Sequence, residues 1–338
     1  MSQLRKIQTI FSYFPVKFKN LSWGMIVLVY LAITGVLQLL GDWGWFNLYY
    51  AHILTIIGVN IILVASLNLV NGYLGEFALG HAGFMGIGAY ASALLAIYIP
   101  LPFPISLIFS LLGGVLVAGL IGYLVGLLTF KTAGDYLAII TLGFNAIIVN
   151  IIQNIEFVGG PRGLTGIPKT TNLFVVSVSL VLTYTILINL VHSKYGRIWL
   201  SIRENTIAAE LMGVNISRAK NTAFTIAAAF AGLAGGLMAQ YQQYITPTSF
   251  NYIKTTELLV MLYLGGVGSL SGSILGVVAY TLLMEILRNA FSFDPRLMEL
   301  RFVISPLILV VIMLTKHFGL MGNHEWRWLR PKEEGTRV

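Results

Sequence analysis

The chain has 338 residues, of which 57% are hydrophobic and only 10% are charged, and its formal net charge is +8. A soluble protein of this length needs more charged side chains to cover its surface, so that class is excluded. Cysteine is absent, which excludes disulfide bonds and thiolate metal sites. The basic residues lie between apolar blocks and at both ends, which is typical of membrane orientation signals rather than of nucleic-acid binding.

The apolar residues form long blocks, and a helix needs about 20 of them to cross a bilayer core. A basic segment over residues 1–22 precedes the first block without a signal-peptide cleavage site, so we expect an anchor. The predicted spans are residues 23–40, 50–70, 84–99, 105–130, 136–155, 173–191, 221–241, the short pair 257–265 and 273–287, and 302–314. We therefore predict an all-α, polytopic transmembrane helix bundle with about eight to ten spans.

The longest polar loop, residues 192–220, carries five basic and two acidic residues. Positive loops stay in the cytoplasm, so we expect this loop, the basic N-terminus and the basic C-terminal tail to lie on that side. The predicted domains are a cytoplasmic N-terminal segment (1–22), a transmembrane domain (23–318) and a cytoplasmic tail (319–338).

Two glycine-rich segments, residues 71–88 and 265–276, interrupt apolar sequence, one in each half of the chain. Glycine costs about 1 kcal/mol relative to alanine inside a helix, so such clusters need a reason. In transporters, paired glycine-interrupted helices often line the substrate path; the alternative is close helix packing through small residues. The candidate residues for a translocation pathway are Gly75, Glu76, Gly80, His81, Gly83, Gly265, Gly266, Gly268 and Ser269.

Five motifs in order resemble one known family. They are LGHAGFMGIGAY (79–90), GDYLAIITLG (134–143), GGPRGLTG (159–166), RENTIAAELMGV (203–214) and LGGVGSLSG (264–272). Over residues 50–314 the chain is similar to the permease subunits of branched-chain amino-acid ABC transporters (LivM-type). The resemblance implies an importer in the bacterial cytoplasmic membrane that also contains a second permease, two cytosolic ATP-binding subunits and an extracytoplasmic solute-binding protein. ATP and magnesium would bind the partner subunits, because none of the ten lysines here follows a glycine as a P-loop requires.

The resemblance also places an ATPase-coupling helix in the loop 192–220. Related permeases carry Glu-Ala-Ala, three residues and then Gly; here Ile207 replaces the glutamate, while Ala208, Ala209 and Gly213 match. Asn205 or Thr206 can cap this helix and Gly213 can end it. Ile207, Leu211 and Val214 are predicted to form one apolar face that binds a partner groove, the alternative being a helix lying on the membrane. The coupling candidates are Arg203, Glu204, Ile207, Ala208, Ala209, Leu211 and Gly213.

Several polar residues leave alternatives open. Glu76 and His81 can polarise the substrate path or relay protons, or they can face water at a turn or bond to free backbone N–H groups. Glu285 and Arg288 are expected to pair, as are Lys131 and Asp135. The loop 159–169 is expected outside, either contacting the binding protein or merely connecting spans.

No catalytic or metal-binding pattern is recognisable, so we expect a transport subunit and not an enzyme. The hydroxyls of Ser269, Ser271 and Ser273 are expected to satisfy backbone groups at the second glycine break. The alternative functions are a permease for urea or short amides and an ion-coupled secondary transporter with Glu76 and His81 as proton sites.

Overall fold

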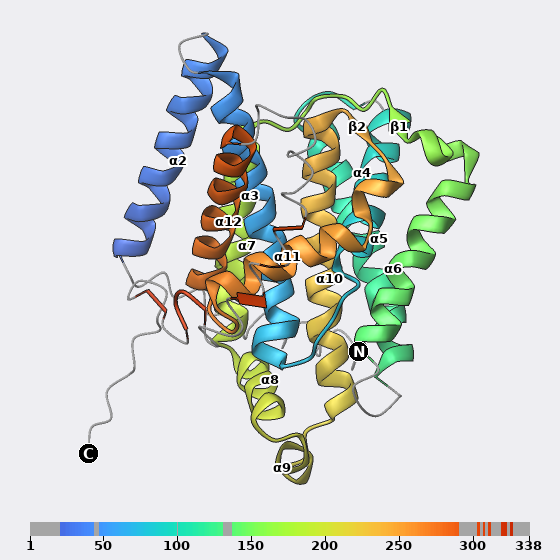
Figure 1. Cartoon of the computed structure of the whole chain (residues 1–338), viewed down its shortest axis with the longest axis vertical. Coiled ribbons are helices and arrows are strands. Elements are labelled where there is room, and N and C mark those ends of the chain that lie inside the picture. The colour runs from blue at the N-terminus through green and yellow to red at the C-terminus, as the bar shows by residue number, and fades with distance from the viewer. Residues whose placement is uncertain are drawn as a thin grey trace, which may run out of the picture.

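The computed structural model describes residues 21–43, 47–99, 101–130, 137–290, 303–304, 307, 310–311, 319–322 and 325–326. The chain is a bundle of long helices (Figure 1). Within the described part, the long elements are α2 (Leu21–Asp42), α3 (Leu48–Asn68), α4 (His81–Tyr98), α5 (Ile105–Thr129), α6 (Leu137–Asn154), α7 (Leu173–Val191), α10 (Ile216–Gln242), α11 (Tyr252–Gly265) and α12 (Leu270–Ala290).

Among the described residues, seven helical segments are long and apolar enough to cross a membrane. One of them is α3 together with the π-helix η1 (Leu69–Leu74), so this span continues to Leu74, beyond the predicted end at residue 70. The all-α, polytopic membrane fold is thereby confirmed. The predicted pair 257–265 and 273–287 corresponds to α11 and α12, both of which begin earlier than expected. Residues 1–20 and most of the predicted span 302–314 and of the tail lie outside the described residues.

Short elements mark the two ends of the bundle (Figure 1). At one end lie α8 (Lys194–Glu204) and α9 (Thr206–Leu211). At the other end β1 (Leu164–Thr165) pairs antiparallel with β2 (Tyr244–Ile245), beside the 3-10 turns η2 (Glu156–Val158), η3 (Gly160–Arg162) and η4 (Pro247–Phe250). The charged loop 192–220 and the loop 159–169 are therefore on opposite sides, as expected from a crossing bundle.

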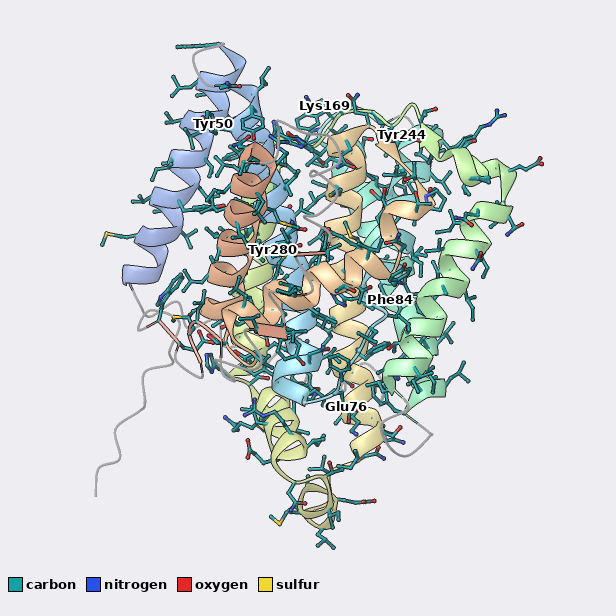
Figure 2. All side chains as sticks on the ribbon, viewed as in Figure 1. Tyr50, Glu76, Phe84, Lys169, Tyr244 and Tyr280 are labelled. Atoms are coloured by element: carbon teal, nitrogen blue, oxygen red, sulfur yellow. The ribbon has the colours of Figure 1, made fainter. Side chains whose placement is uncertain are left out.

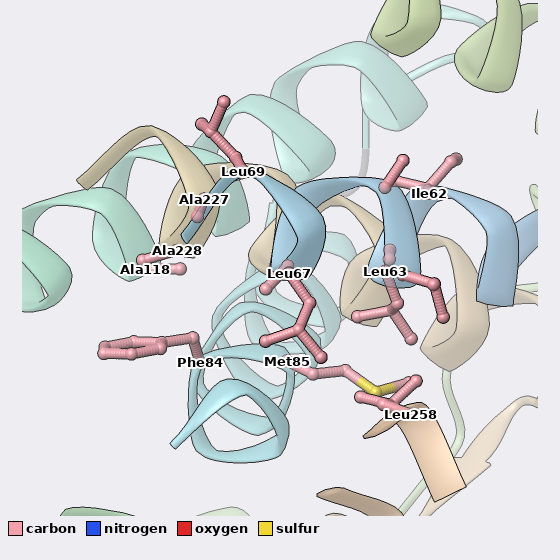
Figure 3. Packing of buried hydrophobic residues seen from close by; sticks show 14 of the residues in the cluster. Ile62, Leu63, Leu67, Leu69, Phe84, Met85, Ala118, Ala227, Ala228 and Leu258 are labelled. Carbon is pink, nitrogen blue, oxygen red and sulfur yellow. The ribbon is translucent and has the colours of Figure 1, made fainter. Parts of the chain in front are cut away.

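The centre of the bundle is α3. In its most apolar stretch 78% of the residues are buried, against 22% for α6, which lies at the edge. Figure 3 shows Leu63 and Leu67 of α3 pointing toward Met85 of α4 and Leu258 of α11, with Ile62 on the other side of α3. This inward packing fixes the position of the C-terminal end of α3, where the first glycine-rich segment begins.

A seam of small residues joins α4, α5 and α10. A Cβ added at Gly88 would lie 2.2 Å from the Gly232 Cα, and one added at Gly114 would lie 2.8 Å from the Gly88 carbonyl oxygen. At Gly232 an added Cβ would lie 2.4 Å from the Ala118 Cβ. The three backbones therefore touch, which is the small-residue packing typical of membrane helices.

Candidate functional site

The first glycine-rich segment unwinds the chain between α3 and α4. The π-helix η1 ends at Gly75, whose φ of +80° is accessible mainly to glycine. Residues 75–80 then have no regular structure, and side chains bind their backbone. Asn71 Oδ1 accepts from the Ala78 N–H at 3.3 Å, and Thr141 Oγ1 accepts from the Leu79 N–H at 2.9 Å. The unwound backbone is thus hydrogen-bonded inside the protein, as non-helical backbone at membrane depth must be.

The second glycine-rich segment is a tight turn between α11 and α12. Gly266 (φ +124°) and Gly268 (φ +84°) make this turn possible. Ser269 is fully buried, and its Oγ accepts from the Gly272 N–H at 3.0 Å, as an N-cap does. The predicted role of the serine hydroxyls at this break is therefore confirmed for Ser269.

The two broken segments meet in the fold, which we call the junction (residues 68–75 and 265–273). Asn68, fully buried near the end of α3, contacts both sides of the second break. Its Oδ1 accepts from the Gly268 N–H at 2.8 Å, and its Nδ2 donates to the Ser269 carbonyl at 2.8 Å and to Ser273 Oγ at 2.9 Å. A Cβ added at Gly72 would lie 2.5 Å from the Gly268 nitrogen. The two broken segments, about 200 residues apart in the sequence, are therefore joined by the side-chain amide of Asn68 and by the close approach of Gly72 to Gly268.

Arg203 connects the charged loop to this junction. It lies at the end of α8, and its Nη1 donates to the Gly72 carbonyl at 2.9 Å. Its side chain also covers Gly75, where an added Cβ would lie 2.5 Å from the Arg203 Cγ. At Gly268 an added Cβ would lie 3.0 Å from Arg203 Nη1. One arginine therefore contacts both broken segments, and the lack of a side chain at Gly75 and Gly268 leaves room for it.

Trp199 anchors the same helix. Its ring is fully buried, and its Nε1 donates to the Ala219 carbonyl of α10 at 3.0 Å. Ser193 begins α8 as an N-cap, accepting from the Tyr195 N–H. The position of Arg203 against the junction is thus set by a helix that is itself fixed to α10.

The predicted coupling helix forms α9. Asn205 caps it by accepting from the Ala208 N–H at 3.0 Å, and Gly213 follows its end with a φ of +85°. Ile207 and Leu211 are 72% and 84% exposed, but Val214 lies beyond the helix and packs partly on the core. The predicted face that included Val214 is therefore wrong, because the helix ends at Leu211; the third exposed apolar residue is Met212, at 85%.

The remaining coupling candidates differ in burial. Ala208 is exposed, whereas Ala209 is 3% exposed and packs inward. Glu204 is exposed and pairs with Arg203 at 3.1 Å. Whether any of these residues touches an ATPase stays a prediction.

The pathway candidates near α4 are packed against α6. A Cβ added at Gly80 would lie 2.9 Å from the Thr141 carbonyl oxygen, and one at Gly83 would lie 3.1 Å from Asn145 Oδ1. His81 is 5% exposed, and its Nε2 lies 2.8 Å from Ser66 Oγ. The expectation that His81 faces water at a turn or bonds to free N–H groups is therefore wrong, because α4 begins at this residue and buries its ring.

Glu76 pairs with Lys220, which lies near the start of α10. Figure 2 shows Glu76 near the α8 end of the bundle, and its side chain is 22% exposed. The pair joins the unwound segment after η1 to the end of the charged loop. A carboxylate held by a lysine does not favour the proton-site reading of Glu76.

Among the other pathway candidates, Gly265 faces α12: an added Cβ would lie 2.0 Å from the Gly272 carbonyl oxygen. Close packing thus explains Gly265, Gly80 and Gly83, while backbone conformation explains Gly75, Gly266 and Gly268. The lining of a pathway by any of them stays a prediction. The expected Glu285–Arg288 pair is confirmed at 2.7 Å, whereas Lys131 and Asp135 lie outside the described residues.

A cavity of about 270 Å³, lined by both polar and apolar side chains, lies at the β1–β2 end. Its lining includes Gln38, Thr55, Lys169, Thr171 and Tyr241, from α2, α3, α10 and the chain after β1. Figure 2 shows Lys169 at this end, opposite Glu76. The loop 159–169 therefore borders an opening on the side away from α9, and its contact with a partner stays a prediction.

Sequence reasoning missed two residues of the junction, Asn68 and Tyr73, and one residue that binds to it, Glu325. Asn68 stood in a predicted span, where a polar side chain is itself a signal of function. Tyr73 and Glu325 carried no local signal: Tyr73 Oη donates to Glu325 Oε1 at 3.1 Å although 252 residues separate them. Such a contact depends on the fold and not on neighbouring sequence.

Comparisons with known proteins agree with this architecture. The family described as "Branched-chain amino acid transport system / permease component" matches residues 49–313. The high-affinity branched-chain amino acid transport system permease proteins LivM of Salmonella typhimurium and of Escherichia coli K12 are each 36% identical in an alignment of 272 positions that covers 70% of this chain. The permease protein LivH of Escherichia coli K12 is 28% identical over 153 residues, covering 45% of this chain and 47% of LivH.

The matched part of this chain covers 63% of the length of the two LivM proteins. No solved structure matches the chain. The family match nevertheless includes α4 to α12, both broken segments and the loop with α8 and α9. This multi-pass membrane protein therefore belongs to the permease component family of branched-chain amino acid transport systems.

Proposed function

We propose that this chain is a permease subunit of an ATP-driven importer for branched-chain or other hydrophobic amino acids in the bacterial cytoplasmic membrane. The family membership and the names of the LivM relatives support this proposal. The chain itself would perform no covalent chemistry, and ATP with magnesium would bind to partner subunits. Because positive loops stay inside, α8 and α9 would face the cytoplasm, as would both termini.

The proposed partners are a second permease, two cytosolic ATP-binding subunits and an extracytoplasmic solute-binding protein. In Escherichia coli K12 two permease proteins of this transport system, LivM and LivH, both match the chain. A pairing with a second, different permease is consistent with this, and the edge helix α6 has surface available for it. The binding protein would approach the β1–β2 end.

The observation that carries the proposal is the connection from α9 to the junction. Three exposed apolar side chains, Ile207, Leu211 and Met212, project from α9 and its last turn, where they contribute little to the fold of this chain. Exposed apolar groups at a surface indicate a binding partner. Directly before α9, Arg203 contacts both broken segments. A force applied to α9 by a partner would therefore reach the two places where the membrane helices are interrupted.

In this mechanism ATP binding by the partner subunits shifts α9 and α8 together. Arg203 carries the shift to Gly72 and Gly268, and the helices on either side of the two breaks tilt because no continuous backbone ladder resists them there. The tilt would alternate access to a pathway near the glycine-rich segments. Substrate contacts would be weak, with selectivity supplied by the binding protein.

The test is copurification and transport with the whole complex in proteoliposomes. We expect the double substitution Leu211→Ser and Met212→Ser to lower copurification of the ATP-binding subunits at least about tenfold, since removing two exposed apolar anchors costs about 1.4 kcal/mol or more. Both side chains are more than 80% exposed, so folding of this chain should be unchanged. Glu210→Gln on the same helix is the control. Normal assembly and leucine uptake in the double variant would contradict the proposal.

A further inference from the structure

The helix α11 brings two charged side chains into the membrane. It has 14 residues, a length of about 21 Å, which is too short to cross a bilayer core of about 30 Å. It begins after η4 at the β1–β2 end and lies across the bundle in Figure 1, and the glycine turn then leads into α12. The helix therefore enters the membrane without crossing it, and its first turns contain Lys254 and Glu257.

The depth of these charges follows from a contact with α3. Lys254 Nζ donates to Asn60 Oδ1 at 3.3 Å. Asn60 is buried and lies next to the middle of the 27-residue apolar segment Leu48–Leu74. An ammonium group that reaches this amide is near the bilayer midplane. Ionisable side chains at that depth are expensive, and they usually mark a pathway for a solute or an ion.

Lys254 and Glu257 neutralise each other but leave much of their hydrogen-bonding capacity unused. Lys254 Nζ lies 3.3 Å from Glu257 Oε2, longer than the distance of about 2.7–2.9 Å that is typical of such a charged pair. Within the part of the chain that the structure describes, Asn60 is the one further side-chain partner of this pair. An ammonium has three N–H donors and a carboxylate has two acceptor oxygens, so several positions stay open for a ligand.

The pair is also accessible. The side chains of Lys254 and Glu257 are 15% and 24% exposed, whereas the next five residues of α11, Leu258 to Leu262, are buried. Lipid is a poor environment for a charge at this depth, so the open side of the pair must face water or protein. Transporters place their substrate sites near the midplane, beside interrupted helices such as α11.

From this geometry we propose that Lys254, Glu257 and Asn60 bind the two charged groups of the transported amino acid as it passes the midplane. Glu257 accepts hydrogen bonds from the α-ammonium group of the substrate, and Lys254 donates to its α-carboxylate. Asn60 holds the lysine in place. The proposal rests on the proposed transport function and deepens it, because it names the α-zwitterion as the group that the permease itself recognises.

The chemistry of an α-amino acid suits this pair. Its ammonium and carboxylate are attached to the same carbon, so both can meet neighbouring countercharges at once. The net charge of the site is zero before and after binding, and no ion is left uncompensated where that is costly. Contacts to the charged groups alone do not distinguish leucine, isoleucine and valine. An uncharged amide such as urea would gain nothing from the pair.

The first test is leucine uptake by the complete complex, with its binding protein, in proteoliposomes. Lys254→Met combined with Glu257→Leu replaces the pair by apolar side chains, a change that often leaves stability unaltered or improved. We expect uptake to fall at least about tenfold through the lost charged contacts, while assembly and ATP hydrolysis stay normal. The matched control is the pair of the same spacing in α12, Glu285→Leu with Arg288→Met, which should keep normal uptake.

Normal uptake in the Lys254→Met, Glu257→Leu variant would overturn the site. Uptake that falls only in proportion to a loss of assembled complex would show that the pair merely fastens α11 to α3, and would overturn it as well. If the variant does not fold, the next measurement decides, because it leaves both charges in place.

The second test detects binding directly. The chain has no cysteine, so Ile253→Cys gives this chain a single maleimide site. The side chain of Ile253 is 41% exposed and lies one turn from Glu257. In the complex without binding protein, saturating leucine should lower the labelling rate at least about fivefold. Isocaproate lacks the ammonium and isopentylamine lacks the carboxylate, so both should protect far less. Equal protection by isocaproate and leucine, or none by leucine, would overturn the site.

Leucine uptake by the unsubstituted complex separates the two proposals. If uptake is absent, the proposed function fails. If uptake occurs and the substitution of both charges does not reduce it, the midplane site alone is refuted.

Discussion

Gly72 offers the sharpest test of the junction. In Gly72→Ala the new methyl carbon would lie 1.9 Å from Asn68 Oδ1, 2.5 Å from the Gly268 nitrogen and 2.9 Å from the Gly268 Cα. Asn68 can rotate away only by giving up its bond to the Gly268 N–H, and the Gly268 contacts are backbone atoms. Overpacking costs about 1–3 kcal/mol, and a lost buried hydrogen bond adds about 1 kcal/mol. We expect a loss of about 2–4 kcal/mol in the free energy of unfolding.

Gly143→Ala is the control, because an added Cβ there meets nothing within 4 Å and the residue lies in α6. Alanine should stabilise that helix by up to about 1 kcal/mol. The assay is the apparent melting temperature of the purified protein in detergent, followed by size-exclusion chromatography. Gly72→Ala should melt at least about 5 °C lower than the unsubstituted chain, and Gly143→Ala no lower. If both variants melt together, the two broken segments do not touch as described and the reasoning fails.

Three further substitutions test the neighbouring contacts. Arg203→Ala should reduce leucine uptake by the complex about tenfold while copurification of the ATP-binding subunits stays normal, because the Gly72 contact is lost and α9 is intact; loss of assembly would contradict this. Asn68→Ala leaves the Gly268 N–H without its partner and should cost about 1–3 kcal/mol, less than additively with Gly72→Ala because the two residues share a partner; additive melting shifts would refute it. Trp199→Phe should cost about 1 kcal/mol through the lost hydrogen bond to the Ala219 carbonyl, and Trp199→Ala about 3–5 kcal/mol, measured as faster proteolysis of the loop 192–220; equal proteolysis rates would argue against α8 as an anchor.

Much of the fold could be predicted because its signals are local. Blocks of apolar residues set the spans, and glycine clusters set the two breaks. Asn205 as a cap and Gly213 as a stop were readable from residue type alone, and the structure has both. The face of α9 was mispredicted at Val214 because helical spacing was extended past the glycine that ends the helix.

The junction itself could not be predicted, since it depends on pairs far apart in sequence. Nothing near Lys220 indicates that its ammonium binds Glu76, and nothing near Glu325 indicates the start of α12. For His81 the sequence indicated a role in the substrate path or in proton transfer, because an ionisable ring within a membrane span is unusual. The structure shows instead a buried ring whose Nε2 lies next to the Ser66 hydroxyl. The π-helix η1 also has no pattern distinct from an α-helix. The roles of these residues are set by partners that lie far away in the sequence.

The seam of α4, α5 and α10 has a consequence for how the subunit moves. Where Gly88, Gly114 and Gly232 bring backbones into contact, there are no rotamers to exchange and no alternative register to adopt without collision. Those three helices should therefore travel as a single rigid body throughout a transport cycle. Deformation is left to the parts joined by polar side chains, so one half of the subunit serves as a fixed frame against which the other half pivots.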